Sequence, residues 1–290
     1  MVSGLFTSRR NRNRLLPISI LLQVPKSGKP DFGAGSGEEC RAICDCRPQA
    51  SRVIIALLYN MYIIPFGGHR MLRADILVIN PNSNPAVTAG LDAALGSLRL
   101  ADGPSIRCAT LSEGPFGIEC QEDVEKVTLP LRRLVEQDNA ADAFVIACFS
   151  DPGLHACREA TRRPVFGINE CGVLSALARG DRFGIIAITA KSVARHQRYL
   201  RQMGLAERLA GERPLGLSGA ETASDERAFA RMEAVGRDLV EKDGADVIVM
   251  GCAGMASYRR PLEATLGVLV IDPTQAAVAM AIGAVQAQML

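Results

Sequence analysis

The sequence predicts an α/β fold in which mostly parallel sheets are flanked by helices. Short apolar runs with little polar alternation recur along residues 71–290, and segments with helical spacing of apolar residues lie between them. Strands without polar alternation are typical of sheets covered by helices on both faces. Regular strand–helix alternation implies right-handed βαβ units. A segment that is echoed later in the chain further indicates two similar halves.

Seven segments are expected to form strands, each three to six residues long. The first follows Met71 closely and reads Asp-Ile-Leu-Val-Ile. The expected strands are residues 75–79, 105–110, 143–147, 165–167, 183–188, 246–250 and 268–271.

Eight segments between these strands are expected to form helices. The first follows Pro81-Asn82-Ser83, a good helix-capping sequence, and the second repeats apolar residues at helical spacing. The expected helices are residues 84–98, 119–137, 153–162, 170–179, 190–203, 225–243, 256–265 and 273–289.

The two similar segments are residues 141–150 and residues 245–254. Both segments read Ala-Asp, then apolar or small residues, then a cysteine, then small residues that open a helix. We therefore expect two half-domains, each presenting one cysteine, Cys148 or Cys252, at the carboxyl end of a strand. Ligands of open α/β sheets bind outside those strand ends, which predicts an active site in the cleft between the halves.

The expected division assigns residues 73–168 plus 268–290 to the first half-domain and residues 169–267 to the second. Residues 1–72 are interpreted as a disordered or non-native extension, with the functional protein beginning near Met71. This segment holds ten of the 33 Lys/Arg and four of the 31 Asp/Glu. Its apolar runs are shorter than the ~20 residues that span a bilayer. Its cysteine cluster, Cys40, Cys44 and Cys46, is only a weak metal signal.

Composition excludes several functional classes. The 290-residue chain is 48% hydrophobic and 22% charged, as in ordinary globular proteins. Aromatic residues make up 4% and tryptophan is absent, so nothing indicates a nucleic-acid partner. The nine cysteines are an odd number scattered along an enzyme-sized chain, which favours a reducing compartment, and we expect a cytoplasmic protein.

Two strand-end cysteines could perform acid–base chemistry. A thiol just before a helix N-terminus is expected to have a lowered pKa, because the helix dipole and backbone N–H groups favour thiolate. Across a cleft, one thiolate could remove a proton from a carbon centre while the other cysteine, as thiol, protonates its opposite face. That inverts the centre without metal or organic cofactor. Backbone N–H groups could hold the developing anionic oxygen.

Several short motifs occur in order along this part of the chain. They are residues 79–83 (INPNS), 114–119 (GPFGIE), 147–154 (ACFSDPGL), 164–168 (PVFGI), 251–255 (GCAGM) and 270–273 (VIDP). From about Ala74 to its end the chain resembles the aspartate/glutamate racemase superfamily, and within it the hydantoin racemases. Ser150 departs from this pattern, which has glycine there.

The resemblance implies Cys148 and Cys252 as the two catalytic bases. It implies a racemase-like α/β fold, a cofactor-independent isomerase, and a small 5-substituted hydantoin or allantoin as substrate, with no metal, nucleic-acid or membrane partner. Homo-oligomer formation is left open, because the helix over residues 275–288 could pack within the domain or against another subunit. The implied substrate-binding residues are Asn80, Phe149, Ser150, Thr189, Ala253 and Gly254.

Alternative functions stay open at this point. Within the superfamily they are an amino-acid racemase, a one-cysteine enzyme like arylmalonate decarboxylase, and an enzyme like maleate isomerase. From another class, the chain could be a non-catalytic small-molecule-binding or thiol-redox protein.

Four other titratable residues are given structural roles. His155 lies two helical turns after Cys148 and is not expected to pair with it, and His196 is expected to be solvated on a polar helix. Asp151 and Asp272 each precede a proline at a helix entry, where capping is the expected role.

Overall fold

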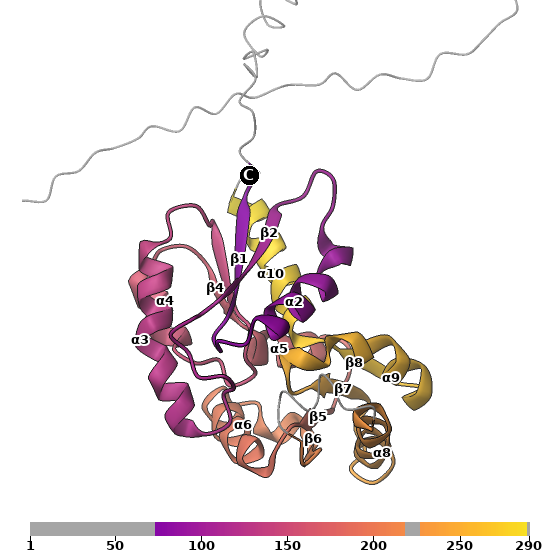
Figure 1. Ribbon diagram of the computed structural model, residues 1–290. Helices are drawn as coiled ribbons and strands as arrows, with labels where there is room; N and C mark the ends of the chain where they lie inside the picture. Colours follow the sequence, from indigo (N-terminus) through magenta and orange to yellow (C-terminus); the bar gives the residue numbers. More distant parts are fainter. Residues whose placement is uncertain (1–72, 218–226, 289–290) are drawn as a thin grey trace, which may run out of the picture. The chain divides into compact units, whose positions relative to one another are not determined.

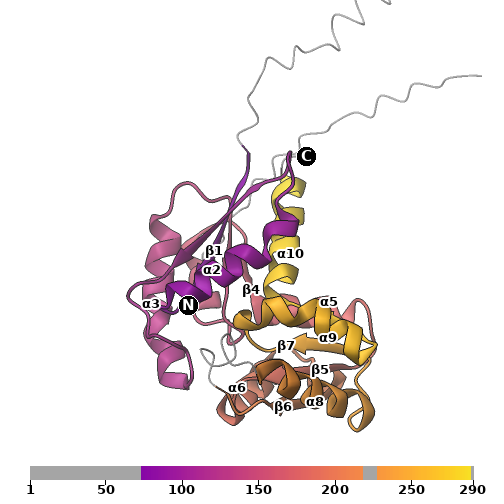
Figure 2. The ribbon, with the colours of Figure 1, turned by 45° about the vertical axis from the view of Figure 1, so that its right-hand side comes forward.

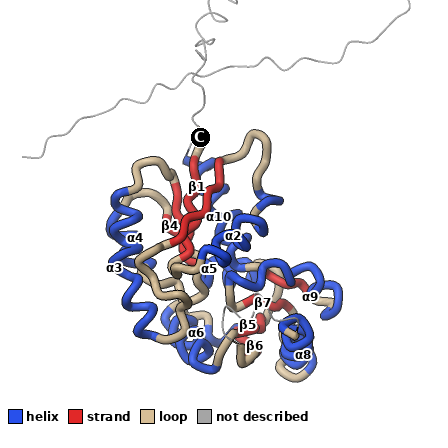
Figure 3. The backbone as a smooth tube through the Cα atoms, in the orientation of Figure 1, coloured by secondary structure: helices blue, strands red, loops and turns tan. Residues whose placement is uncertain are grey.

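The computed structural model describes residues 73–217 and 227–288. Within them, eight strands form two parallel four-stranded sheets flanked by helices, as the colouring by secondary structure shows (Figure 3). This confirms the predicted fold class. The expectations for residues 1–72, including the basic start, the apolar runs and the Cys40–Cys46 cluster, lie outside the described residues.

The first sheet has the strand order β2-β1-β3-β4, with all neighbours parallel. Its strands are β1 (Asp75–Asn80), β2 (Ser105–Thr110), β3 (Ala143–Ile146) and β4 (Val165–Gly167). The helices that follow its strands are α2 (Pro85–Ala94), the 3₁₀ turn η1 (Gly96–Leu98), α3 (Gln121–Gln137), α4 (Leu154–Ala160) and α5 (Ile168–Leu177). Figure 1 shows α3 and α4 on one side of this sheet, with α2 and α10 (Pro273–Gln288) on the other.

The second sheet repeats this plan in the order β6-β5-β7-β8, again with parallel neighbours. Its strands are β5 (Phe183–Ala187), β6 (Leu209–Pro214), β7 (Val247–Met250) and β8 (Leu269–Ile271). The associated helical segments are α6 (Ala190–Gln202), η2 (Ala206–Arg208), α8 (Ala228–Glu241), η3 (Ala253–Tyr258) and α9 (Arg259–Leu266). Strands β3 and β7, which follow the two echoed Ala-Asp pairs, hold the same place in the two sheets.

Strand β6 was missed by the sequence reading. It reads Leu-Ala-Gly-Glu-Arg-Pro and lies at the edge of its sheet, with most of its residues half-buried. An edge strand contacts only one neighbour, so it tolerates proline and polar residues that would be excluded from a central strand. The apolar pattern used to find the other seven strands is absent here for that reason.

One expected boundary is wrong. Residues 268–272 were grouped with the first half, but β8 pairs with β7 of the second sheet. The helix after it, α10, contacts β1, β3 and β4 of the first sheet and packs along α5. Figure 2 shows α10 running beside β1 and β4. The chain therefore leaves the second sheet only at Pro273.

The apolar strands are buried on both faces. In β1, Ile76 and Val78 belong to a cluster that also contains Ile185 of β5 and Val249 of β7, so the two sheets share one central core. The alternate residues of β1 face the other way, against α3 and α4. A matching outer cluster joins β5 and β7 to α8 and α9.

The repeated Ala-Asp pair has a structural role at the amino ends of the strands. The carboxylate of Asp142 accepts a hydrogen bond from Asp75 N at the start of β1, 2.8 Å away. In the second sheet, Asp246 accepts from Asp181 N and Arg182 N just before β5, at 2.8 and 3.1 Å. Each aspartate thus ties its strand to the neighbour and leaves the carboxyl ends free for other functions.

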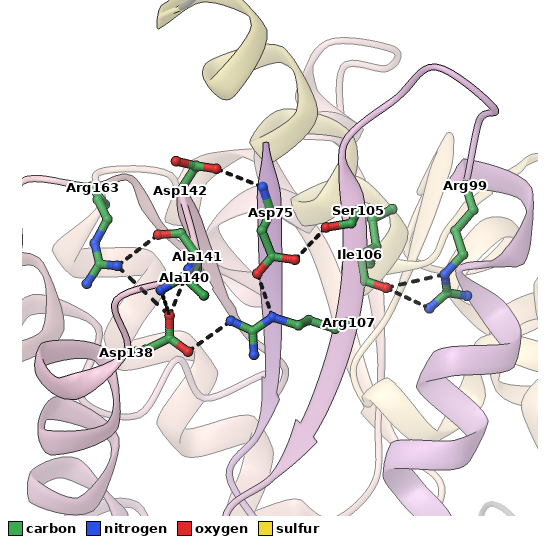
Figure 4. A network of polar contacts seen from close by, with 10 residues as sticks. All are labelled: Asp75, Arg99, Ser105, Ile106, Arg107, Asp138, Ala140, Ala141, Asp142 and Arg163. Carbon is green, nitrogen blue, oxygen red and sulfur yellow. Dashed lines mark hydrogen bonds and ion pairs between the residues drawn. The ribbon is translucent and has the colours of Figure 1, made fainter. Parts of the chain in front are cut away.

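Further polar contacts surround this end of the first sheet (Figure 4). Arg107 of β2 lies between Asp75 of β1 and Asp138 at the end of α3, and it forms an ion pair with each. Asp138 also accepts from the backbone N–H groups of Ala140 and Ala141. These charged groups therefore gather around the amino ends of the strands of the first sheet, away from the carboxyl ends.

Asp151 and Asp272 cap helices, as expected, but Asp151 does not cap the helix that it precedes. Its two carboxylate oxygens accept from Asn169 N and Glu170 N, each at 2.9 Å, at the start of α5. Asp272 accepts from Gln275 N at 2.7 Å, in the first turn of α10. Burial raises the pKa of Asp151 to about 7, against the opposing effect of its two N–H donors.

Gly167 leaves the space that this carboxylate fills. A Cβ on Gly167 would lie 2.2 Å from Asp151 Cγ. We expect Gly167→Ala to lower the free energy of unfolding by about 1–3 kcal/mol, because overpacking displaces a buried capping group. Urea unfolding followed by circular dichroism measures this. The control is Gly90→Ala in α2, where an added Cβ would meet no atom within 4 Å and should stabilise the helix by up to about 1 kcal/mol. Equal stability of the two variants would contradict the packing argument.

Candidate active site

One pocket lies where the carboxyl ends of both sheets meet. Its wall combines the loop after β1, the loop between β2 and α3, the segment after β3, the start of α6 and the segment after β7. The lining residues are Asn82, Asn84, Val87, Phe116, Gly117, Ile118, Glu119, Ala147, Cys148, Phe149, Ser150, Ile188, Ser192, Arg195, His196, Gly251, Cys252, Ala253 and Gly254.

Cys148 is presented by the tight turn that follows β3. Ala147 N still donates to Ile79 O of β1, and Asp151 N then donates back to Cys148 O. The thiol is half-buried. Burial raises the pKa of Cys148 to about 12, which the backbone N–H of Ser150 only partly opposes.

Cys252 occupies the corresponding place after β7, at the N-cap of η3. Gly254 N donates to its Sγ at 3.4 Å. Burial raises the pKa of this thiol as well, and the negative charge of Asp272 acts in the same direction. Gly251 permits the approach of this turn to β5, since a Cβ there would lie 2.6 Å from Ile186 O.

The two cysteines therefore lie in one pocket, but their ionisation differs from the prediction. Helix ends and backbone N–H groups were expected to lower both pKa values. The loss of hydration in the pocket outweighs the donated hydrogen bonds, so both pKa values are raised. A charge on Cys252 also raises the pKa of Cys148, which disfavours ionisation of both thiols together.

Four of the six predicted binding residues line the pocket and two do not. Phe149, Ser150, Ala253 and Gly254 are in the wall. The side chain of Asn80 is fully buried behind the wall. Its amide donates to Asn82 Oδ1, Asn84 O and Thr88 Oγ1 at 3.0–3.1 Å, so it shapes the loop that brings Asn82 and Asn84 to the pocket.

Thr189 likewise acts beside the pocket. Its hydroxyl accepts from Ser192 N and caps α6, and it is Ser192, one turn later, that reaches the wall. The sequence reading placed the polar contacts at the strand ends. The structure places them two to four residues further along the following loops or helices.

Arg195 was missed, although it connects the two halves of the site. It lies on α6 and donates to Glu119 O of the facing loop at 2.9 Å and to Ser150 Oγ at 3.5 Å. Its guanidinium also donates to Ser192 Oγ and Lys191 O. One arginine among several on a polar helix gives no sequence signal for this role.

His196 was expected to be solvated, and that expectation is wrong. Its side chain is 2% exposed, and Nδ1 lies 2.6 Å from Glu212 Oε1 on β6. Because β6 was not recognised as a strand, the partner that buries this histidine could not be foreseen. His155 was not expected to pair with Cys148. It lies outside the wall of this pocket and lines a neighbouring cavity together with His196.

The loop before α3 closes the remaining side of the pocket. Ser83 N donates to Pro115 O at 2.9 Å, which joins this loop to the one after β1. Gly114 makes the contact possible, because a Cβ there would lie 2.2 Å from Pro81 O. The loop contributes Phe116, whose side chain is largely exposed at the pocket.

A model of the Asp/Glu/Hydantoin racemase family matches residues 76–281. The chain belongs to this family. The match confirms the resemblance drawn from the motifs, and with it the racemase class of isomerases. The same residues carry both sheets and the pocket.

Individual relatives of this racemase agree with the family assignment. A hydantoin racemase from Paenarthrobacter aurescens is 38% identical over 206 residues, which cover 70% of this chain and 87% of the relative. A hydantoin racemase from Pseudomonas sp. strain NS671 is 36% identical over 213 residues, covering 71% and 84%. Among solved structures, an allantoin racemase from Klebsiella pneumoniae has a TM-score of 0.71 at 28% identity, covering 74% of this chain and 89% of that structure.

No helix in the described part of this racemase is long and apolar enough to cross a membrane.

The raised thiol pKa values can be tested by alkylation. Iodoacetamide reacts with thiolate, so the rate of labelling at Cys148 should rise about tenfold per pH unit between pH 7 and pH 10. Mass spectrometry of the digested protein measures the rate at each cysteine, and circular dichroism checks folding at each pH. A rate that levels off by pH 10 would show that the pocket does not raise the pKa of Cys148.

Proposed function

We propose that the protein racemises 5-substituted hydantoins, or the related allantoin, by proton transfer at C5 between Cys148 and Cys252. The observation that carries the proposal is the placement of the two thiols. They occupy equivalent turns after β3 and β7 of two sheets with the same strand order, and both line one pocket. The hydantoin and allantoin racemases among its relatives support the substrate class.

The chemistry requires one base and one acid on opposite faces of the substrate carbon. The carbonyl next to C5 acidifies its proton, so a thiolate can remove it. The second cysteine, as thiol, then delivers a proton to the other face, and the configuration is inverted. The atoms balance, because each turnover moves one proton from substrate to one sulfur and one proton from the other sulfur to substrate.

The electrostatics of the pocket suit this division of roles. Burial and mutual repulsion hold the pair at one negative charge or none, so a thiolate is accompanied by a thiol. Partial desolvation also makes the thiolate a stronger base than an exposed one. No organic cofactor is needed for these steps.

Replacement of either cysteine tests the proposal. Single enantiomers of 5-benzylhydantoin and allantoin in D₂O should lose optical rotation and gain deuterium at C5 with the parent protein. Cys148→Ser and Cys252→Ser should each slow this by a factor on the order of 10²–10⁴, because a serine hydroxyl is a poor base. Polarimetry and NMR follow the two signals.

The matched control is Cys120→Ser. Cys120 is the N-cap of α3 and is not in the pocket wall, and serine is a preferred N-cap residue, so activity should be unchanged. A folded parent that racemises neither substrate would refute the proposal and favour the decarboxylase, isomerase or binding-protein alternatives. Full activity in either pocket variant would refute the two-cysteine mechanism.

The rate should also depend on pH. The active form needs one thiolate, and both thiol pKa values are raised, so the active fraction grows as pH increases and falls as pH decreases. We expect kcat/KM to increase between pH 7 and pH 9, approaching tenfold per unit. Initial rates of deuterium exchange, corrected for exchange without protein, measure it. A flat profile over this interval would mean that the reacting base is already ionised at pH 7.

A further inference from the structure

A buried histidine–glutamate pair lies in the wall of the pocket, and the two-cysteine mechanism does not use it. His196 comes from α6 and Glu212 from the edge strand β6, with Nδ1 and Oε1 2.6 Å apart. The side chains are 2% and 0% exposed. An acid and an imidazole buried together are unusual in an apolar interior, because each carries a large desolvation cost.

The pair lies on the Cys148 side of the pocket. The His196 ring meets the ring of Phe149 edge-on, with 4.9 Å between centroids. Phe149 directly follows Cys148, and its carbonyl is held by Asn169 Nδ2 at 2.6 Å. The imidazole is therefore supported from two sides, by Glu212 and by Phe149.

One ring nitrogen is left for a ligand. Nδ1 is engaged with Glu212, whereas Nε2 has no hydrogen-bond partner in residues 73–217 and 227–288. His196 is a wall residue of the pocket. The neighbouring cation Arg195 is already committed to Glu119 O, Ser150, Ser192 and Lys191 O, so it is less free to bind substrate.

The surroundings of Glu212 favour its protonated, neutral form. Its Oε2 is buried without a partner. Burial raises the pKa of Glu212, and the hydrogen bond to His196 opposes that shift. A buried pair avoids net charge. When the carboxyl carries the proton of the 2.6 Å contact, Nδ1 accepts it, and the single ring proton lies on Nε2, which is then a donor.

We propose that the Nε2–H of His196 donates a hydrogen bond to the substrate carbonyl oxygen that gains negative charge when the C5 proton leaves, with Glu212 as the positioning residue that keeps this proton on Nε2. The inference rests on the proposed racemase function and adds a side-chain donor to it. A donor aimed at developing charge in a desolvated pocket accelerates the step more than it strengthens substrate binding.

Nitrogen NMR of the histidine rings tests the protonation and the contact. The chain has three histidines, so ¹⁵N-histidine labelling gives a simple spectrum, and His196→Phe identifies the His196 signals. The probe is unsubstituted hydantoin, which is achiral. We expect Nε2 to carry a proton in the free protein and its signal to shift saturably with hydantoin. Saturation is judged from the backbone amides of Ser150 and Gly254.

Kinetics test the role of the donor. The variant His196→Phe/Glu212→Leu removes both buried polar groups, a change that is often neutral for stability. We expect kcat to fall about 10²-fold or more, KM to stay within about threefold, and the thermal midpoint to stay near that of the parent. His155→Phe makes the same substitution at an exposed histidine outside the pocket wall and should leave kcat unchanged.

The outcomes separate this inference from the proposed function. An unprotonated Nε2, or one that does not respond to saturating hydantoin, overturns the inference, as does a folded double variant with kcat within threefold of the parent. If the double variant does not fold, the NMR titration decides alone. If the parent neither binds hydantoin nor racemises its derivatives, the proposed function fails and the inference fails with it.

Discussion

The central apolar core shared by the two sheets is the constraint on which the site depends. Alternate residues of β1, β5 and β7 pack into one cluster with α5 and α10. This packing holds the two sheets against each other, so that the carboxyl ends of β3 and β7 open on the same pocket. Each cysteine is the second residue after the end of its strand and cannot shift without disturbing a buried strand. The rigidity that the proposed two-sided proton transfer requires thus comes from ordinary hydrophobic packing.

The same burial determines the electrostatics. Both Cys148 and Cys252 are partly buried, and this loss of hydration raises both pKa values despite the backbone donors at Ser150 and Gly254. The polar groups that remain near the pocket are mostly engaged with one another. Asp151 caps α5, Arg195 joins α6 to the loop that carries Glu119, and Asn80 shapes the loop after β1. These contacts position the wall, and few groups are left to meet a ligand directly.

The comparison of sequence with structure shows where local pattern is informative. The repeated Ala-Asp and cysteine segments predicted two similar halves and the positions of both thiols. This was possible because a buried strand and the turn after it are both specified by residues that are close together in the sequence. The pattern failed at β6, whose edge position allows Gly, Glu, Arg and Pro. That failure hid the partner of His196. The pattern also failed at Asn80 and Thr189. Their polar side chains do not line the pocket themselves but hold the neighbouring residues that do.

The sequence by itself determined the alternation of strands and helices, the two halves, the family and the two cysteines, because each depends on residues close together in the chain. The tertiary structure alone decided that β8 belongs to the second sheet, that Arg195 bridges the pocket and that His196 is buried against Glu212. It also reversed the expected direction of the thiol pKa values. The physical reason is the same in each case. Desolvation and pairing depend on what surrounds a group in space, and those neighbours come from distant parts of the chain.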